Sequence, residues 1–303
     1  MKIKRVMPSV GQANPSKSPD AKASIKGFCV PLICANLNFF DAPAIIILSK
    51  IRKYFVLFLK KLIPNLFTAL NFMCGCLGVY LAFKNLFEAA FLMVVIGAFF
   101  DLFDGFFARL LKAESAFGLQ FDSMADLITS GLVPSMVMYK LFLEIGIHEV
   151  DFSLHLLSNE FTFSFAPFGL VAFLIALGAG IRLSNFNVDE EQRFDFKGLP
   201  APANALFIVS LPLLIDHPLF LALKPYVTNY SVLLGITLLS AILMNVRLPL
   251  FSFKIKSNRF QDYTYQLILL VSSLPLFYFF QWVAVPLVIL FYVFLNVIRS
   301  SLD

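Results

Sequence analysis

Charged residues are scarce in this 303-residue chain. Asp, Glu, Lys and Arg together supply 14% of the residues, against about one-quarter in an ordinary soluble domain. Hydrophobic residues supply 59%, and the mean hydropathy is +0.82. This composition excludes an ordinary soluble domain. It predicts an all-α, polytopic membrane protein whose spanning helices pack as a bundle.

Cysteine and histidine are also few, which argues against a zinc site and against a catalytic histidine. No His lies at a zinc-like spacing from any of the four Cys, and Cys74 and Cys76 are two positions apart on an apolar helix. We interpret the cysteines as small, buried apolar residues. The three His fall on the outer side of the topology described below, so none is expected to be catalytic.

Long apolar runs begin at Pro64, which we place at a first helical position. A spanning helix needs about 20 mostly apolar residues. Eight stretches satisfy this pattern, at 64–83, 87–111, 121–143, 166–186, 202–222, 229–246, 265–281 and 283–299. We therefore expect about eight spanning helices.

The first 55 residues differ in character from the rest. Residues 1–27 are polar, basic and rich in Ser, Pro and Lys, which predicts a disordered tail. Residues 44–61 are interpreted as an amphipathic or juxtamembrane helix. The expected organisation is thus an N-terminal extension at 1–55 and a transmembrane catalytic domain at 56–303. An alternative is that residues 1–50 lie upstream of the working start of the protein.

Positive charge is distributed unequally between the two sides of the predicted bundle. With the N-terminus inside and an even number of spans, the outer side receives three of the 24 Lys and Arg, namely Lys84, Lys140 and Lys224. The long outer loop at 144–165 is acidic and holds no Lys or Arg. We expect a protein of the cytoplasmic membrane with its N-terminus in the cytoplasm. The net charge of +5 favours anionic lipid headgroups of the bilayer as partners, with no role in nucleic-acid binding.

Four aspartates gather in the stretch DLFDGFFARLLKAESAFGLQFDSMAD, at the predicted cytoplasmic ends of the second and third helices. Asp101 and Asp104 are three apart, and Asp122 and Asp126 are four apart, so each pair shares a helix face. Two antiparallel helices can aim all four side chains into one cavity. Hard oxygen ligands in this number suit Mg²⁺ or Mn²⁺.

Small residues and an arginine are interleaved with these acids. Gly105 and Ala108 leave room for a flat ligand, and Arg109 offers a forked donor for a phosphate. The pattern indicates phosphate transfer with a metal clamp. A structural ion or a proton path is disfavoured, because four intramembrane acids are costly. A cation transporter is a remote alternative, but we find no internal repeat of the kind such proteins show.

The spacing of these residues is D-x2-D-G-x2-A-R-x8-G-x3-D-x3-D, beginning at Asp101 and ending at Asp126. It matches the signature of the CDP-alcohol phosphatidyltransferases at every fixed position, and the chain resembles that family. The resemblance implies a six-helix catalytic core and a divalent-metal site that faces the cytoplasm. It also implies a reaction that displaces CMP from a CDP-activated lipid or alcohol.

Residue roles carry over from this resemblance by motif position. The implied metal ligands are Asp101, Asp104, Asp122 and Asp126, of which Asp126 is also the general base. The implied nucleotide-binding residues are Gly105, Ala108, Arg109 and Gly118. Asn65 and Thr68, which share a face of the first spanning helix, either contact the CDP group or form a helix cap or a helix–helix hydrogen bond.

Other stretches resemble the membrane-integral bacterial phosphatidylserine synthases of this family. They are IPNLFTALNFMCG at 63–75, FDSMADLITSGLVP at 121–134, GIRLSNFNV at 180–188 and FKGLPAPANA at 196–205. This resemblance predicts CDP-diacylglycerol and L-serine as substrates. The wider family resemblance implies a homodimer.

Three residues are candidates for binding the acceptor. Arg182 suits a lipid phosphate or a substrate carboxylate, and Asn185 lies on the same face. Lys197 is either a sensor of phosphate or carboxylate or an ordinary inside-positive loop residue. Phosphatidylglycerophosphate synthesis, or transfer to another alcohol, stays open because several basic residues lie near the site. The eight-helix count and the GLPAPANA segment favour serine.

Overall fold

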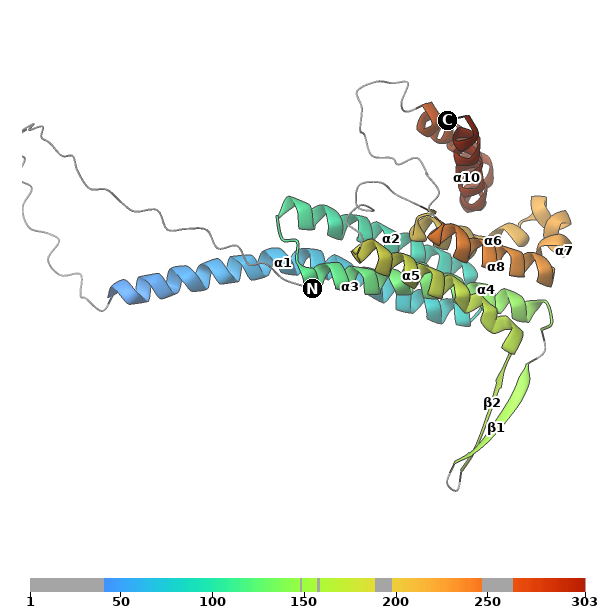
Figure 1. Ribbon diagram of the computed structural model, residues 1–303, viewed down its shortest axis with the longest axis horizontal. Helices are drawn as coiled ribbons and strands as arrows, with labels where there is room; N and C mark the ends of the chain where they lie inside the picture. The colour runs from blue at the N-terminus through green and yellow to red at the C-terminus, as the bar shows by residue number, and fades with distance from the viewer. Residues whose placement is uncertain (1–40, 148, 157–158, 189–197, 247–263, 303) are drawn as a thin grey trace, which may run out of the picture. The chain divides into compact units, whose positions relative to one another are not determined.

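The computed structural model describes residues 41–147, 149–156, 159–188, 198–246 and 264–302 (Figure 1). The chain divides into two units, Met1–Ile51 and Arg52–Asp303. The described part of the first unit is the beginning of one long helix, and the site lies within the second unit. The predicted disordered tail at 1–27 lies outside the described residues.

Helices make up nearly all of the described chain. In order, the elements are α1 (Asp41–Phe83), α2 (Phe87–Leu110), α3 (Ala116–Asp126), the π-helix η1 (Leu127–Leu132), α4 (Val133–Glu144), β1 (Val150–Leu156), β2 (Asn159–Phe165), the 3₁₀-helix η2 (Pro167–Phe173), α5 (Leu174–Val188), α6 (Ala201–Ile215), η4 (Pro218–Leu223), α7 (Lys224–Val227), α8 (Tyr230–Asn245), α9 (Thr264–Phe280), η6 (Gln281–Val283) and α10 (Ala284–Leu302). The predicted all-α membrane class is confirmed.

Among the described residues, five helical segments are long and apolar enough to cross a membrane: Leu59–Phe83, Phe87–Leu110, Ala116–Glu144, Pro167–Val188 and Gln266–Asn296. Two further predicted spans correspond to the shorter apolar helices α6 and α8. The last two predicted spans are α9 and α10, which form one apolar segment interrupted at η6. Hydropathy alone does not show where a helix stops, and a 3₁₀ segment beginning at Pro218 shortens the span predicted for 202–222.

α1 continues through Pro64, contrary to our placement of this residue at a first helical position. The juxtamembrane helix predicted for 44–61 and the first span are one helix. Proline in a spanning helix removes one hydrogen bond without ending the helix, because neighbouring groups satisfy the freed carbonyl. Proline is therefore a weaker sign of a helix boundary in a membrane-spanning helix than in a soluble protein.

α3 begins earlier than the expected span at 121–143. The side chain of Ser115 caps the helix by accepting a 3.0 Å hydrogen bond from the backbone N–H of Gly118. Figure 1 shows the chain turning back from α2 into α3. This early start places Asp122 and Asp126 on one helix that runs back past the end of α2.

A π-helix follows Asp126 directly and separates α3 from α4. Pro134, in the first turn of α4, has no N–H to offer to the preceding turn. A wider π turn is one way in which a membrane helix accommodates such a gap. π-helical turns occur frequently at functional sites, and this one begins at the residue after a predicted catalytic aspartate.

The loop predicted for 144–165 contains an antiparallel β-hairpin, with β1 paired to β2 in the register Val150↔Phe165 to Leu156↔Asn159. Apolar and polar residues alternate in VDFSLHL and NEFTFSF, the period typical of strands. Ser164 donates a 2.6 Å hydrogen bond to Asp151 across the pair. This alternation is local and predicts two strands in a segment that we had expected to be an acidic loop.

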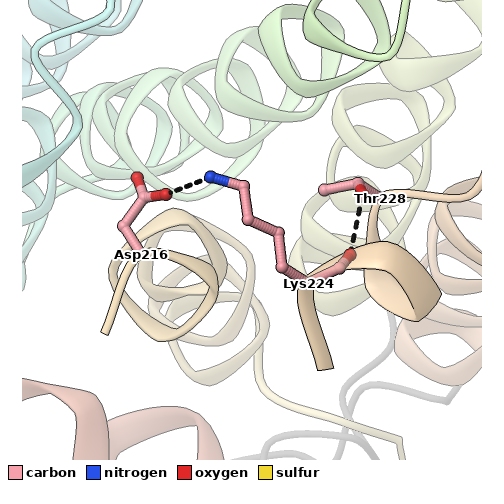
Figure 2. Close-up of polar contacts among 3 residues, drawn as sticks. All are labelled: Asp216, Lys224 and Thr228. Carbon is pink, nitrogen blue, oxygen red and sulfur yellow. Dashed lines mark hydrogen bonds and ion pairs between the residues drawn. The ribbon is translucent and has the colours of Figure 1, made fainter. Parts of the chain in front are cut away.

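A second polar contact joins α6 to α7, and Figure 2 shows it. Lys224 donates a 2.8 Å hydrogen bond to Asp216, and this carboxylate raises the pKa of the lysine. Thr228 donates to the backbone carbonyl of Lys224 at 2.7 Å. Both charged side chains are exposed, so the ion pair contributes little to stability.

Candidate active site

Three of the four signature aspartates meet where α2 passes α3. One carboxylate oxygen from each of Asp101, Asp122 and Asp126 lies within 4.8 Å of the others. The helical spacings predicted that all four aspartates would face one cavity, since each pair projects from one face of its helix. Like charges held this close in a membrane protein repel strongly unless a cation neutralises them.

Asp104 does not belong to this group of three. Its side chain is 6% exposed and accepts a 2.6 Å hydrogen bond from the hydroxyl group of Thr68 on α1. Beside Thr68, the ring of Phe67 stacks on Phe107 of α2 with 5.2 Å between centroids. The helix–helix hydrogen bond that we considered for Thr68 is therefore present, and it holds Asp104 towards α1.

A cavity of about 650 Å³ adjoins the acids. Its lining includes every residue predicted to bind the nucleotide, namely Asn65, Thr68, Gly105, Ala108, Arg109 and Gly118. Asp104 and Asp122 also line it. Carboxylates, small residues and an exposed arginine thus surround one space between α1, α2 and α3.

The two signature glycines have different surroundings. A Cβ atom at Gly118 would lie 3.2 Å from Ser115 Oγ and 3.4 Å from Asn65 Oδ1, so close packing explains this glycine. A Cβ atom at Gly105 would meet only Arg109 Nη2, at 3.9 Å. No packing contact in the described chain requires glycine at this position, which lines the cavity.

The residues present fit a divalent cation. Oδ1 of Asp122 is buried and has no hydrogen-bond partner among the residues that the structure describes, and a buried polar atom normally has one. Asp122 is one of the three aspartates that each offer a carboxylate oxygen within 4.8 Å of the others. A hard cation with oxygen ligands would satisfy Oδ1 of Asp122 and the charge around it.

Two of the predicted acceptor-binding residues, Arg182 and Asn185, do not line this cavity. Arg182 donates a 2.7 Å hydrogen bond from Nη1 to the carbonyl group of Met244 on α8, and it does not line the 650 Å³ cavity. Asn185 lines a separate groove of about 580 Å³ between η1 and α5. Lys197 lies outside the described residues. A role for these three residues in acceptor binding stays a prediction.

Sequence reasoning missed a pair of polar residues that contact the site. Asn71 on α1 is fully buried and donates a 3.1 Å hydrogen bond to Asp126 Oδ1. Thr129 in η1 donates to Asn71 Oδ1 at 2.9 Å. The cost of a buried amide in an apolar helix, together with its position three residues after Thr68, was a signal that could have identified Asn71.

A second missed pair joins α5 to α3. Asn187 donates a 2.9 Å hydrogen bond to Ser123, which itself donates to the carbonyl group of Leu119 at 3.0 Å. Ser123 lies between Asp122 and Asp126 on the helix. This pair links the end of α5, whose Phe186 lines the cavity, to the helix that carries two of the acids.

Clustered carboxylates at the end of membrane helices, beside a cavity with small residues and an arginine, define a membrane-embedded phosphotransfer enzyme. A sequence model of the CDP-alcohol phosphatidyltransferase family matches residues 61–251. The chain belongs to this family.

Relatives in the family carry names that specify an acceptor. The chain is 32% identical over 202 residues to the CDP-diacylglycerol–serine O-phosphatidyltransferase of Helicobacter pylori, a match that covers 65% of this chain and 75% of the relative. It is 32% identical over 161 residues to the Bacillus subtilis protein of the same name, covering 53% and 80% of the two chains. An archaetidylserine synthase of Methanothermobacter thermautotrophicus is 31% identical over 150 residues, covering 49% and 56%.

Proposed function

We propose that this protein transfers the phosphatidyl group from CDP-diacylglycerol to the hydroxyl group of L-serine, giving phosphatidylserine and CMP. The single observation that carries the proposal is the meeting of Asp101, Asp122 and Asp126 beside a cavity lined by the rest of the family signature. The names of the relatives support serine as the acceptor.

The 650 Å³ cavity is the proposed site of the CDP group. Gly105 leaves the floor of the cavity open, and the guanidinium group of Arg109 can donate two parallel hydrogen bonds to a phosphate. The cavity is built at the ends of spanning helices, so the acyl chains of the donor lipid can stay in the bilayer while its headgroup enters. Asn65 and Thr68 complete the wall on the α1 side.

We propose Mg²⁺ or Mn²⁺ as the cation of the site, held by Asp101, Asp122 and Asp126, with Asp104 as the fourth predicted ligand. When bound, the cation would neutralise negative charge on the diphosphate and on departing CMP. The unpartnered oxygen of Asp122 supports this assignment.

Asp126 is the proposed general base. Its carboxylate takes the proton of the serine hydroxyl group as the hydroxyl oxygen forms a bond to the phosphorus of the phosphatidyl group. The bond between that phosphorus and the oxygen bridging to CMP breaks, and CMP leaves with the electron pair. The position of Asp126 beside Asp101 and Asp122 supports this role, because the base must lie next to the reacting phosphate.

The proposal also covers the membrane location, the domain boundaries and the oligomeric state of the protein. The charge distribution supports an active site and an N-terminus on the cytoplasmic side of the cytoplasmic membrane. Residues 56–303 are proposed as the catalytic domain and residues 1–55 as an extension. A homodimer, which the family resemblance implies, can be checked from the mass of the protein in detergent by light scattering.

An acceptor panel tests the function directly. The full chain in detergent is supplied with CDP-diacylglycerol, Mn²⁺ or Mg²⁺, and one of L-serine, glycerol 3-phosphate, inositol phosphate or choline, and CMP release is measured. We expect release that depends on serine, with an Asp101→Asn variant as the inactive control. Release only with glycerol 3-phosphate would instead identify the chain as a phosphatidylglycerophosphate synthase.

A further inference from the structure

We infer that Asn71 and Thr129 are positioning residues that hold Asp126 in the orientation needed to accept the proton of the acceptor alcohol. This inference rests on the proposed function, since it concerns the proposed base. It adds two residues outside the family signature, one on α1 and one in the π-helix η1. The supporting observations are the hydrogen bonds of these residues, the two glycines that contact them and the π-helical turn.

The hydrogen bonds define which way the Asn71 amide faces. Its oxygen accepts from the Thr129 hydroxyl group at 2.9 Å, and its nitrogen donates to Asp126 Oδ1 at 3.1 Å. An amide has one acceptor end and one donor end. If it were turned over, its oxygen would face a carboxylate oxygen, two acceptors with no hydrogen between them. Thr129 therefore ensures that Asn71 presents its donor to Asp126.

Thr129 differs from three other buried hydroxyl groups in these helices and resembles Ser240 of α8, which donates to Asn204 Oδ1 at 2.7 Å. Ser135, Ser210 and Thr237 each donate to the carbonyl group four residues earlier, at 2.8, 2.6 and 2.8 Å. This local bond is the usual solution for a hydroxyl group inside a helix. Thr129 instead donates across to Asn71, to the side chain at 2.9 Å and to the backbone oxygen at 3.2 Å. Its location in η1 separates it from the regular helical pattern.

Two glycines make room for this pair on neighbouring helices. A Cβ atom at Gly75 of α1 would lie 2.6 Å from Thr129 Oγ1. A Cβ atom at Gly97 of α2 would lie 2.8 Å from Thr129 Cγ2 and 2.9 Å from Asn71 Oδ1. Distances this short exclude a side chain at either position. Glycine at these two positions thus allows the backbones of α1 and α2 to pack closely against the side chains of Asn71 and Thr129.

The Asn71–Thr129 pair gives Asp126 a hydrogen-bond donor that can fix its orientation. Asp126 lies within 4.8 Å of two other carboxylates that repel it, so its orientation requires a donor from another direction. In the described chain, Asn71 is the residue that supplies this hydrogen bond. An amide carries no titratable proton, so it can hold one oxygen of the carboxylate without competing for the proton of the acceptor.

A matched pair of substitutions at Thr129 tests the inference. Thr129→Val keeps the shape and removes the hydroxyl group, whereas Thr129→Ser keeps the hydroxyl group. We expect Thr129→Val to lower kcat for serine-dependent CMP release by about tenfold to a hundredfold, the scale of a small misplacement of a catalytic group. The KM values for CDP-diacylglycerol and serine should stay within about twofold, and Thr129→Ser should restore most of kcat.

Thr237→Val is the control, because it removes a buried hydroxyl group of α8 that bonds within its own helix. It should lower the thermal midpoint in detergent as much as Thr129→Val does, without the loss of kcat. Equal kcat values for Thr129→Val and Thr129→Ser would overturn the inference, as would a parallel rise in both KM values. Wild-type protein that releases CMP with another alcohol instead of serine would overturn the proposed acceptor alone, and the two Thr129 variants would then be compared with that alcohol.

Discussion

The hydroxyl group of Thr68 on α1 lies 2.6 Å from Oδ2 of Asp104 on α2. Both residues are buried, so this bond replaces contacts that each group would make with water. Asp104 is not one of the three signature aspartates whose carboxylate oxygens lie within 4.8 Å of one another. Two hydroxyl groups, on Thr68 and Thr129, therefore contribute to the orientation of the acids, one by a direct bond and one through Asn71.

Replacing Thr68 with valine should weaken both stability and activity. The variant leaves a buried carboxylate oxygen without its donor, which costs about 1–3 kcal/mol. We expect a lower thermal midpoint in detergent and a fall of about tenfold in kcat/KM for CDP-diacylglycerol. Thr68→Ser keeps the donor and should resemble wild type in both measurements. An unchanged kcat/KM in Thr68→Val would show that the orientation of Asp104 is unimportant for donor binding.

Asp126→Asn should abolish transfer while largely sparing nucleotide binding. An amide has nearly the shape of the carboxylate but cannot take a proton from serine, and general-base catalysis contributes typically 10²–10⁴-fold. CMP release and metal-dependent binding of CDP-diacylglycerol can be measured separately on the same preparation. If turnover survives at the wild-type rate, the base is a different residue.

Removing divalent cations should stop the reaction reversibly. The three clustered carboxylates and the unpartnered oxygen of Asp122 require a cation to bind an anionic diphosphate. We expect no CMP release after chelation and full recovery on adding Mg²⁺ or Mn²⁺. Asp122→Asn should raise the cation concentration needed for half-maximal activity. Activity that persists at full rate in excess chelator contradicts the proposed metal site.

Gly105→Ala should affect donor binding without harming the fold. A Cβ atom there meets no atom closer than 3.9 Å, and alanine favours a helix over glycine by about 0.5–1 kcal/mol. We expect an unchanged or higher thermal midpoint and a raised KM for CDP-diacylglycerol, because the methyl group occupies the cavity floor. Gly235→Ala on α8, where a Cβ atom also has open space, is the matched control and should leave KM unchanged. Equal KM values in the two variants would remove Gly105 from the nucleotide site.

Arg182→Ala separates an acceptor role from a structural one. If the guanidinium group binds the serine carboxylate, the KM for serine should rise more than the KM for CDP-diacylglycerol. If its bond to the Met244 carbonyl is its main contribution, the thermal midpoint should fall and both KM values should change together. The ratio of the two KM changes, measured with the full chain in detergent, distinguishes the two roles.

Local patterns were enough for the parts of this protein that depend on neighbouring residues. The fold class followed from the scarcity of charge, and the pairing of acids followed from spacings of three and four on a helix. The signature extends over 26 residues and predicted the lining of the cavity, from Gly105 to Gly118. The hairpin β1–β2 was also predictable, since its alternation is local.

Contacts between distant segments could not be predicted in this way. Asn71 and Asp126 are 55 positions apart, and Thr68 and Asp104 are 36 apart. Each bond depends on which faces of α1, α2 and α3 pack together and at what depth. Those faces are chosen by side-chain fit, including the close approach at Gly75 and Gly97.

The proposed chemistry of the site follows from residue types and spacing, because metal ligands and phosphate donors must come from a small set of side chains. The sequence does not show which of the four aspartates come together. Three acids form the cluster and the fourth bonds to Thr68, although all four look equivalent in the sequence. Packing of the three helices breaks this equivalence, since hydrogen bonds form only between groups that the fold brings within about 3 Å of each other.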